Sequence, residues 1–211
     1  AAGGSVGGAY TVDRGFVGAA VDWFDTEYGL PNEADVHIEL DRLRLDTRGR
    51  WDAPFAGARS IAWAVGFSDY EHTEFEGPEP GTIFEQQAVE GRVEVAHRPW
   101  GCWEGAIGFQ GGYADLSVTG EEALLPFAKT AAFAVFVTER RPLTGCLDLE
   151  LGAGAEGTDV DSVGHETFFA PSLSAGLRWQ PRDATVVALS AAYASRAPTA
   201  SELYADGPHV A

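Results

Sequence analysis

Residues 147–156 read Leu147-Asp148-Leu149-Glu150-Leu151-Gly152-Ala153-Gly154-Ala155-Glu156. The odd positions of this stretch are apolar, while the even positions are carboxylates or glycines. Successive side chains of a β-strand point to opposite faces, so the pattern predicts a strand with one face in lipid and the other in a watery or tightly packed interior. A soluble core would be hard to build from such a strand.

The same period of two returns along the whole chain and predicts about ten strands of this kind. We therefore expect an all-β fold: an antiparallel transmembrane β-barrel segment of about ten strands, a number that could also close a small barrel by itself. Tilted strands of roughly nine to eleven residues suffice to cross a bilayer core. Further examples of the alternation are Ile61–Ser68, Val89–Val95, Ser172–Trp179 and Val187–Arg196.

Composition limits the alternatives. No stretch approaches 18 consecutive apolar residues, the length that a membrane-spanning helix requires. The formal net charge is −18, with 32 Asp and Glu against 14 Lys and Arg. A protein that binds nucleic acid needs a basic patch, so we expect no nucleic-acid partner and favour cations or cationic ligands instead.

The predicted connections alternate between short and long. Those that contain Pro or Gly are short, and the ones between them are longer and acidic; outer-membrane barrels likewise have short periplasmic turns and longer extracellular loops. Four of the six tryptophans lie beside the short turns, as expected of an aromatic girdle at one membrane interface: Trp51, Trp100, Trp103 and Trp179. The predicted long loops are 28–34, 71–82, 118–128, 157–167 and 197–211.

The end of the chain contains the most specific local motif, Arg196-Ala197-Pro198-Thr199-Ala200-Ser201-Glu202-Leu203-Tyr204-Ala205-Asp206-Gly207-Pro208-His209. It resembles the Arg-x-Pro-x-x-x-Glu-Leu-Tyr-x-x-Gly-Pro-His run of TonB-dependent outer-membrane receptors, which closes a strand and enters an extracellular loop. We also expect a short helical turn here, with Pro198 near its start. Further stretches resemble the branch of this family that includes zinc-uptake receptors: 66–77 with 90–94 and 97–99 after it, and 120–123.

The resemblance implies a barrel of about 22 strands with an N-terminal plug domain. We therefore expect residues 1–211 to be an internal part of such a barrel, without the plug domain and the C-terminal strands, and with two unpaired edges. The family implies a receptor and active transporter for a scarce nutrient such as a metal ion, a metal chelate or a siderophore. Its implied partners are the lipid bilayer, a small nutrient ligand and an inner-membrane energy-transducing protein that acts through the plug.

Candidate ligand contacts lie in acidic segments near the predicted long loops. His72, Glu74 and Glu76 share one face of a strand end, and Asp159, Asp161, His165 and Glu166 are close enough in sequence for a flexible loop to gather them around a divalent cation. For both groups the alternative is a hydrated acidic rim. His209 is either a ligand contact or a loop-packing residue. Glu33, Asp35 and His37 stand where zinc-uptake relatives often have a run of histidines.

Inside the barrel, we expect the charged residues of neighbouring strands to pair with one another. Glu90, Arg92 and Glu94 belong to one predicted strand, and Asp148 and Glu150 to another. We expect these residues to pair across strands with arginines such as Arg178. Cys102 and Cys146 are too few to define a disulfide framework, and we expect them to be unpaired.

Two further functions remain open alongside the receptor. One is a passive, porin-like or structural barrel whose acidic loops keep the surface hydrophilic, and the other is a soluble all-β binding module. No nucleophile-base arrangement is present and the five histidines are scattered, so we expect no enzymatic activity and no cofactor.

Overall fold

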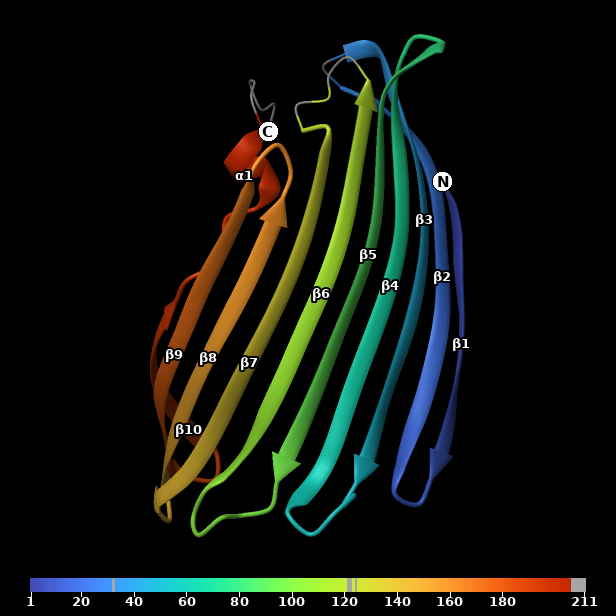
Figure 1. The fold of residues 1–211 in the computed structure, drawn as a ribbon. Coiled ribbons are helices and arrows are strands. Elements are labelled where there is room, and N and C mark those ends of the chain that lie inside the picture. Colours follow the sequence, from blue (N-terminus) through green and yellow to red (C-terminus); the bar gives the residue numbers. More distant parts are fainter. Residues whose placement is uncertain (32, 121–122, 124, 206–211) are drawn as a thin grey trace.

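The computed structural model describes residues 1–31, 33–120, 123 and 125–205. Within these residues the chain is one antiparallel sheet followed by a short helix (Figure 1). The elements are β1 (Ala2–Val12), β2 (Gly15–Leu30), β3 (Glu33–Asp52), β4 (Ala58–Glu76), β5 (Glu79–His97), β6 (Glu104–Gly120), β7 (Phe127–Thr144), β8 (Leu147–Asp161), β9 (His165–Arg182), β10 (Thr185–Ala194) and α1 (Ala200–Tyr204).

Each strand pairs with the next one in the chain, in the order β1 to β10. The sheet curves into a tall wall in which β10 lies behind β8 and β9 (Figure 1). Among the described residues, β1 and β10 each pair on one side only, so the wall does not close on itself. The prediction of an all-β, open barrel segment of about ten strands is confirmed.

The strands are longer than predicted, and most of the predicted long loops are wrong for that reason. In place of a loop over residues 71–82, β4 continues to Glu76 and β5 begins at Glu79. Only Gly77 and Pro78 connect them, and Gly77 adopts a φ of +63°, which glycine tolerates best. The acidic composition of these segments led to the prediction of loops. The strands continue nonetheless, because antiparallel pairing satisfies the backbone hydrogen bonds in water as well as in lipid.

The same correction applies to 157–167, where β8 runs to Asp161 and β9 begins at His165. It applies also to 28–34, because β2 ends at Leu30 and β3 begins at Glu33. The candidate ligand contacts of these regions therefore lie on paired strands, whose side-chain directions are set by the ladder.

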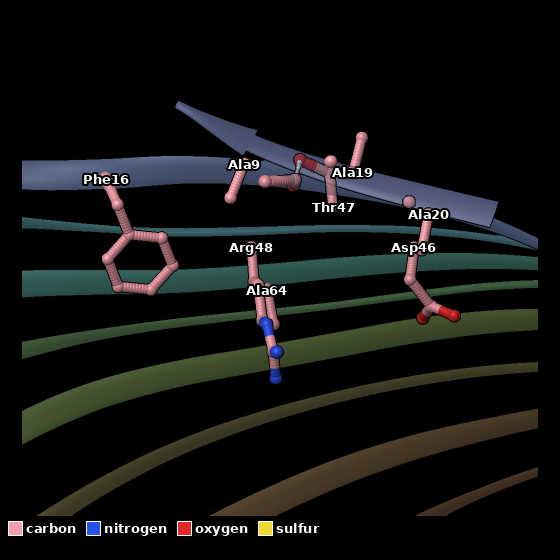
Figure 2. Close-up of a pocket in the computed structure, with 11 residues that line it drawn as sticks. Ala9, Phe16, Ala19, Ala20, Asp46, Thr47, Arg48 and Ala64 are labelled. Atoms are coloured by element: carbon pink, nitrogen blue, oxygen red, sulfur yellow. Dashed lines mark hydrogen bonds between the residues drawn. The ribbon is translucent and has the colours of Figure 1, made fainter. Parts of the chain in front are cut away.

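The predicted alternation separates two faces. We call the face of the even positions in β2–β10 the concave face, since Asp46 and Arg48 point from it into the space that the sheet encloses (Figure 2). The opposite, convex face carries the exposed apolar side chains, of which Phe133 is 58% and Leu189 is 73% exposed. Others on this face are Val65, Val89, Phe109, Val135, Leu173 and Leu177.

Few of the described side chains are buried, because the wall has one layer and no second layer of protein covers either face. Several of the buried apolar side chains lie at the end of the wall opposite the short turns, and one of them, at residue 125, lies between β6 and β7. They are Ile38, Val118, Leu125, Ala128 and Val160. The convex apolar surface must therefore be covered by something other than this chain, as the bilayer covers a barrel. Over the part of the chain that the structure describes, no helix combines the length and apolarity needed to cross a membrane.

The end of the wall with the short turns carries the predicted aromatic side chains. Trp51 and Trp179 are about half exposed, and Trp100 pairs with Trp103 through an isolated bridge between β5 and β6. The guanidinium of Arg141 lies 5.5 Å from the ring centroid of Trp103. This arrangement of tryptophan and arginine is what an interface with lipid head groups favours.

Candidate ligand-binding surface of the concave face

The first charged cluster of the concave face joins three strands. Arg44 donates from Nε to Asp46 Oδ2 at 2.8 Å and from Nη2 to Glu90 Oε1 at 3.0 Å. Gly66 lies between Asp46 and Glu90 in the ladder. A Cβ at Gly66 would stand 3.0 Å from Arg44 Nη2 and 3.1 Å from Asp46 Oδ1. The missing side chain at residue 66 therefore lets Arg44 reach across β4 to β5.

A second cluster surrounds Arg92. Its Nη2 donates to Glu94 Oε2 at 3.1 Å and its Nη1 donates to Gln110 Oε1 at 3.2 Å. The guanidinium also lies 4.1 Å from the ring centroid of Phe136, a cation-π geometry. Arg92 is thus held by groups from β5, β6 and β7.

Asp148 is the centre of a third cluster. It is 8% exposed and accepts hydrogen bonds from Arg140 Nη2 at 2.6 Å and from Arg178 Nη1 at 3.5 Å. Arg178 also donates to Gln180 Oε1 at 2.9 Å. The predicted pairing of Asp148 with Arg178 is confirmed, and the three clusters together give a wall on which most of the arginine charge is compensated locally.

A hollow of about 710 Å³ lies on the concave side of β1–β4 (Figure 2). Small residues leave this space free, and they include Gly7, Ala9, Gly18, Ala20 and Ala64. Phe16, Asp46 and Arg48 project beside it. Among the described residues, Arg48 has no hydrogen bond or ion pair. Its guanidinium is therefore available to a carboxylate or phosphate group.

His72 lies on the concave face near the upper end of β4, among aromatic side chains. Its ring stacks on Phe84 with centroids 4.2 Å apart, and Tyr70 meets it edge-on at 5.5 Å. Nε2 stands 3.9 Å from Glu74 Oε1, and within the described part of the chain the buried Nδ1 has no hydrogen-bond partner. Glu76 follows two residues later on the same face. The structure therefore brings His72 and Glu74 together, as the alternation predicts.

The other predicted group is divided between the two faces. Asp159, Asp161 and His165 occupy odd positions and point to the convex side, whereas Glu166 belongs to the concave side. His165 Nε2 lies 3.2 Å from Asp159 Oδ2, which also accepts a hydrogen bond from Thr167 Oγ1 at 3.1 Å. The ladder of β8 and β9 therefore prevents all four from meeting at one point.

Over the described ranges, no group of three or more His, Cys, Asp or Glu side chains lies close enough to hold a metal ion.

His209 lies outside the described residues. Cys102 and Cys146 are free and exposed, as predicted.

Comparison with known proteins fits this architecture. A family model described as TonB dependent receptor-like, beta-barrel, matches residues 3–211. The chain belongs to this family. It is therefore an outer-membrane protein, in keeping with the apolar convex face and the aromatic rim.

Two solved structures resemble this TonB-dependent receptor segment in fold. The copper transporter OprC superposes with a TM-score of 0.76 at 14% identity, over 96% of this chain and 38% of that chain. The alcaligin outer-membrane receptor FauA from Bordetella pertussis gives a TM-score of 0.64 at 14% identity, over 88% of this chain and 34% of that chain. The segment thus spans little more than a third of the length of either structure.

The run from Arg196 to Tyr204, which first indicated the TonB-dependent receptors, has a structural role in this chain. Thr199 caps α1, with its side chain accepting from Glu202 N while Glu202 accepts from Thr199 N. Tyr204 packs over Gly164 of the β8–β9 connection, where a Cβ would stand 3.0 Å from Tyr204 Cε1. Partial burial, followed by the charges of Glu166 and Asp161, raises the pKa of the Tyr204 hydroxyl. The motif therefore folds the segment after β10 back onto the wall.

Sequence reasoning missed the residues of this receptor segment that line the hollow. Arg48 and Phe16 stand 32 positions apart and line the same hollow because the β2–β3 register places Arg50 opposite Phe16. The sequence did contain a signal. On β1, β2 and β4, many of the positions that face the concave side carry small residues, which leaves room beside the large side chains of Phe16 and Arg48.

Proposed function

We propose that the full-length protein is an outer-membrane receptor and active transporter. It takes up a scarce nutrient, which is a metal ion, a metal chelate or a siderophore. Energy reaches it from an inner-membrane energy-transducing protein through a plug domain outside these 211 residues. The names of the two solved structures, a copper transporter and an alcaligin receptor, support this class of cargo.

One observation supports the proposal beyond family membership. The concave face combines compensated arginines, such as Arg44 between Asp46 and Glu90, with a hollow bounded by glycine and alanine. A wall of this kind offers hydrogen bonds and space without a dense field of one charge. Such a surface suits contact with a polar ligand, or with a polar protein domain, that moves along the concave face.

We assign the first ligand contacts to His72, Glu74 and Glu76 at the upper end of β4, with Glu166 on the same face of β9. The imidazole of His72 and the carboxylates beside it are donors of the kind that divalent metals accept. Asp159, Asp161 and His165 are not included, because their side chains point away from the enclosed space.

Uptake of labelled cargo tests the transport function. The full-length protein is expressed in cells that lack their own receptors, and uptake of labelled Cu²⁺, Zn²⁺ and a ferric siderophore is measured with and without a protonophore. We expect saturable uptake of one cargo that the protonophore abolishes. Unsaturable uptake that is insensitive to the protonophore would instead identify a passive barrel.

A matched pair of histidine variants tests the assigned contacts. His72→Ala is expected to raise the half-saturating concentration of the cargo at least fivefold, because His72 faces the enclosed space. His165→Ala removes the same side chain from the convex side and is expected to leave uptake unchanged. Equal effects of both variants would contradict the assignment to the concave face.

A further inference from the structure

A pit on the convex face lies among β4–β7. Gly91 of β5 and Gly111 of β6 are directly opposite one another in the ladder. Val65 of β4 flanks Gly91, and Phe133 of β7 flanks Gly111. Two adjacent glycines thus leave a floor of bare backbone between larger side chains, with a volume of about 430 Å³ above it.

Apolar side chains surround this floor along the strands as well. The pair Val89 and Tyr113 lies at one end, and the pair Val93 and Phe109 at the other. The rings of Phe109 and Phe133 stack with centroids 6.1 Å apart at one corner. The pit therefore has walls on four sides, and side chains of all of these residues line it.

The position of the pit decides what fills it. It lies within the apolar band of an outer-membrane wall, continuous with the surface that lipid covers. At about 3.3 Å per residue, Gly111 is roughly 13 Å along β6 from Asp115, where the convex face becomes charged. The hydrocarbon band of such barrels is about 25 Å tall, so the pit faces lipid tails rather than head groups or water.

We propose that the pit binds one acyl chain of a phospholipid. Lipid tails and apolar side chains have similar polarity, so retention in a membrane depends on close packing rather than on the exclusion of water. An acyl chain in a four-sided pit contacts more atoms than one on a flat wall, and each contact adds dispersion energy. The floor also offers no side-chain polar group, which matches a tail and not a head group.

Gly91→Leu tests the proposal because it fills the pit without disturbing the backbone. A Cβ at Gly91 would stand 3.7 Å from Val65 Cγ2, an ordinary contact. Ala175→Leu on β9 is the matched control, since it adds a leucine to the same face away from the pit. Both variants place more apolar surface in lipid, so loss of folding is not expected from either.

The measurement is native mass spectrometry of the full-length protein, purified in mild detergent and reconstituted with phosphatidylethanolamine. We expect wild type and Ala175→Leu to retain one phospholipid, and the occupancy to fall at least fivefold in Gly91→Leu. Equal occupancy in all three proteins, or none in wild type, would overturn the proposal. A retained mass of lipopolysaccharide, or a dimer lost in Gly91→Leu, would also overturn it by identifying another occupant. None of these readouts depends on transport.

Discussion

Arg196 and Glu202 form a two-pronged ion pair across the start of α1. Nη1 of Arg196 donates to Glu202 Oε2 at 2.6 Å, and Nη2 donates to Oε1 at 2.5 Å. The same carboxylate accepts from Thr199 N at 2.8 Å. The carboxylate of Glu202 therefore links Arg196, which follows the end of β10, to Thr199, the N-cap of α1.

This pair predicts a pH dependence of the segment after β10. Hydrogen bonding from Arg196, and then from the Thr199 backbone, lowers the pKa of Glu202 to about 2, against an ordinary value of 4.5. A carboxyl group whose folded-state pKa is depressed stabilises the folded segment above its unfolded pKa, and this contribution is lost as the pH falls from about 4.5 to 2. The protection factors of residues 199–205, which are exchange rates corrected for the intrinsic rate at each pH, are expected to stay constant from pH 7 to 5 and to fall below pH 5, while those of the neighbouring strands change less.

Glu202→Gln is the matching variant. It is expected to raise exchange in α1 already at pH 7 and to remove the acid dependence, because the neutral amide cannot form the ion pair. An unchanged acid profile in this variant would show that another group controls the segment.

Asp148→Ala is expected to destabilise the wall more than Glu150→Gln. The first variant leaves Arg140 and Arg178 without their shared acceptor, and losing one partner of such a cluster costs more than losing an exposed carboxylate. Urea midpoints of the full-length protein in lipid vesicles measure the difference. Equal midpoints for the two variants would mean that the cluster contributes little to folding.

The depth of the membrane band predicts different costs for two arginine substitutions on the convex face. Val135 lies near the middle of β7, so Val135→Arg is expected to cost roughly 2 to 4 kcal/mol. Leu149 lies beside the turn and opposite Arg141, so Leu149→Arg is expected to cost only about 0 to 1 kcal/mol. Reversible unfolding in vesicles gives both values. A larger cost for Leu149→Arg than for Val135→Arg would mean that the hydrocarbon band does not lie at the level of Val135.

Thiol labelling checks which end of the wall faces the cell surface. Cys102 and Cys146 are exposed at the short turns, so an impermeant maleimide is expected to label them only after the outer membrane is permeabilised. Val163→Cys lies at the opposite end, where Val163 is 64% exposed. In a background without the two native cysteines, it is expected to react in intact cells. Labelling in the opposite sense would invert the orientation.

The alternation of single strands was a sufficient guide to the faces of the wall, but contacts across two strands were not predictable. Asp148 and Arg178 belong to neighbouring strands, and parity alone brings them together. Arg44 and Glu90 are separated by β4 and by 46 positions, so their contact depends on two registers and on the glycine between them. The strand ends were also missed, since hydrophobicity marks where a strand lies in lipid and not where its ladder stops.

The continuation of the strands past the apolar band has a consequence for any cargo. β4 spans 19 residues. At about 3.3 Å per residue such a strand is some 60 Å long, whereas the hydrocarbon band is about 25 Å tall. Even a tilted wall of this length extends well beyond the bilayer at the end opposite the short turns. Under the transport function proposed above, a cargo molecule would meet side chains such as His72 before it reaches the level of the membrane.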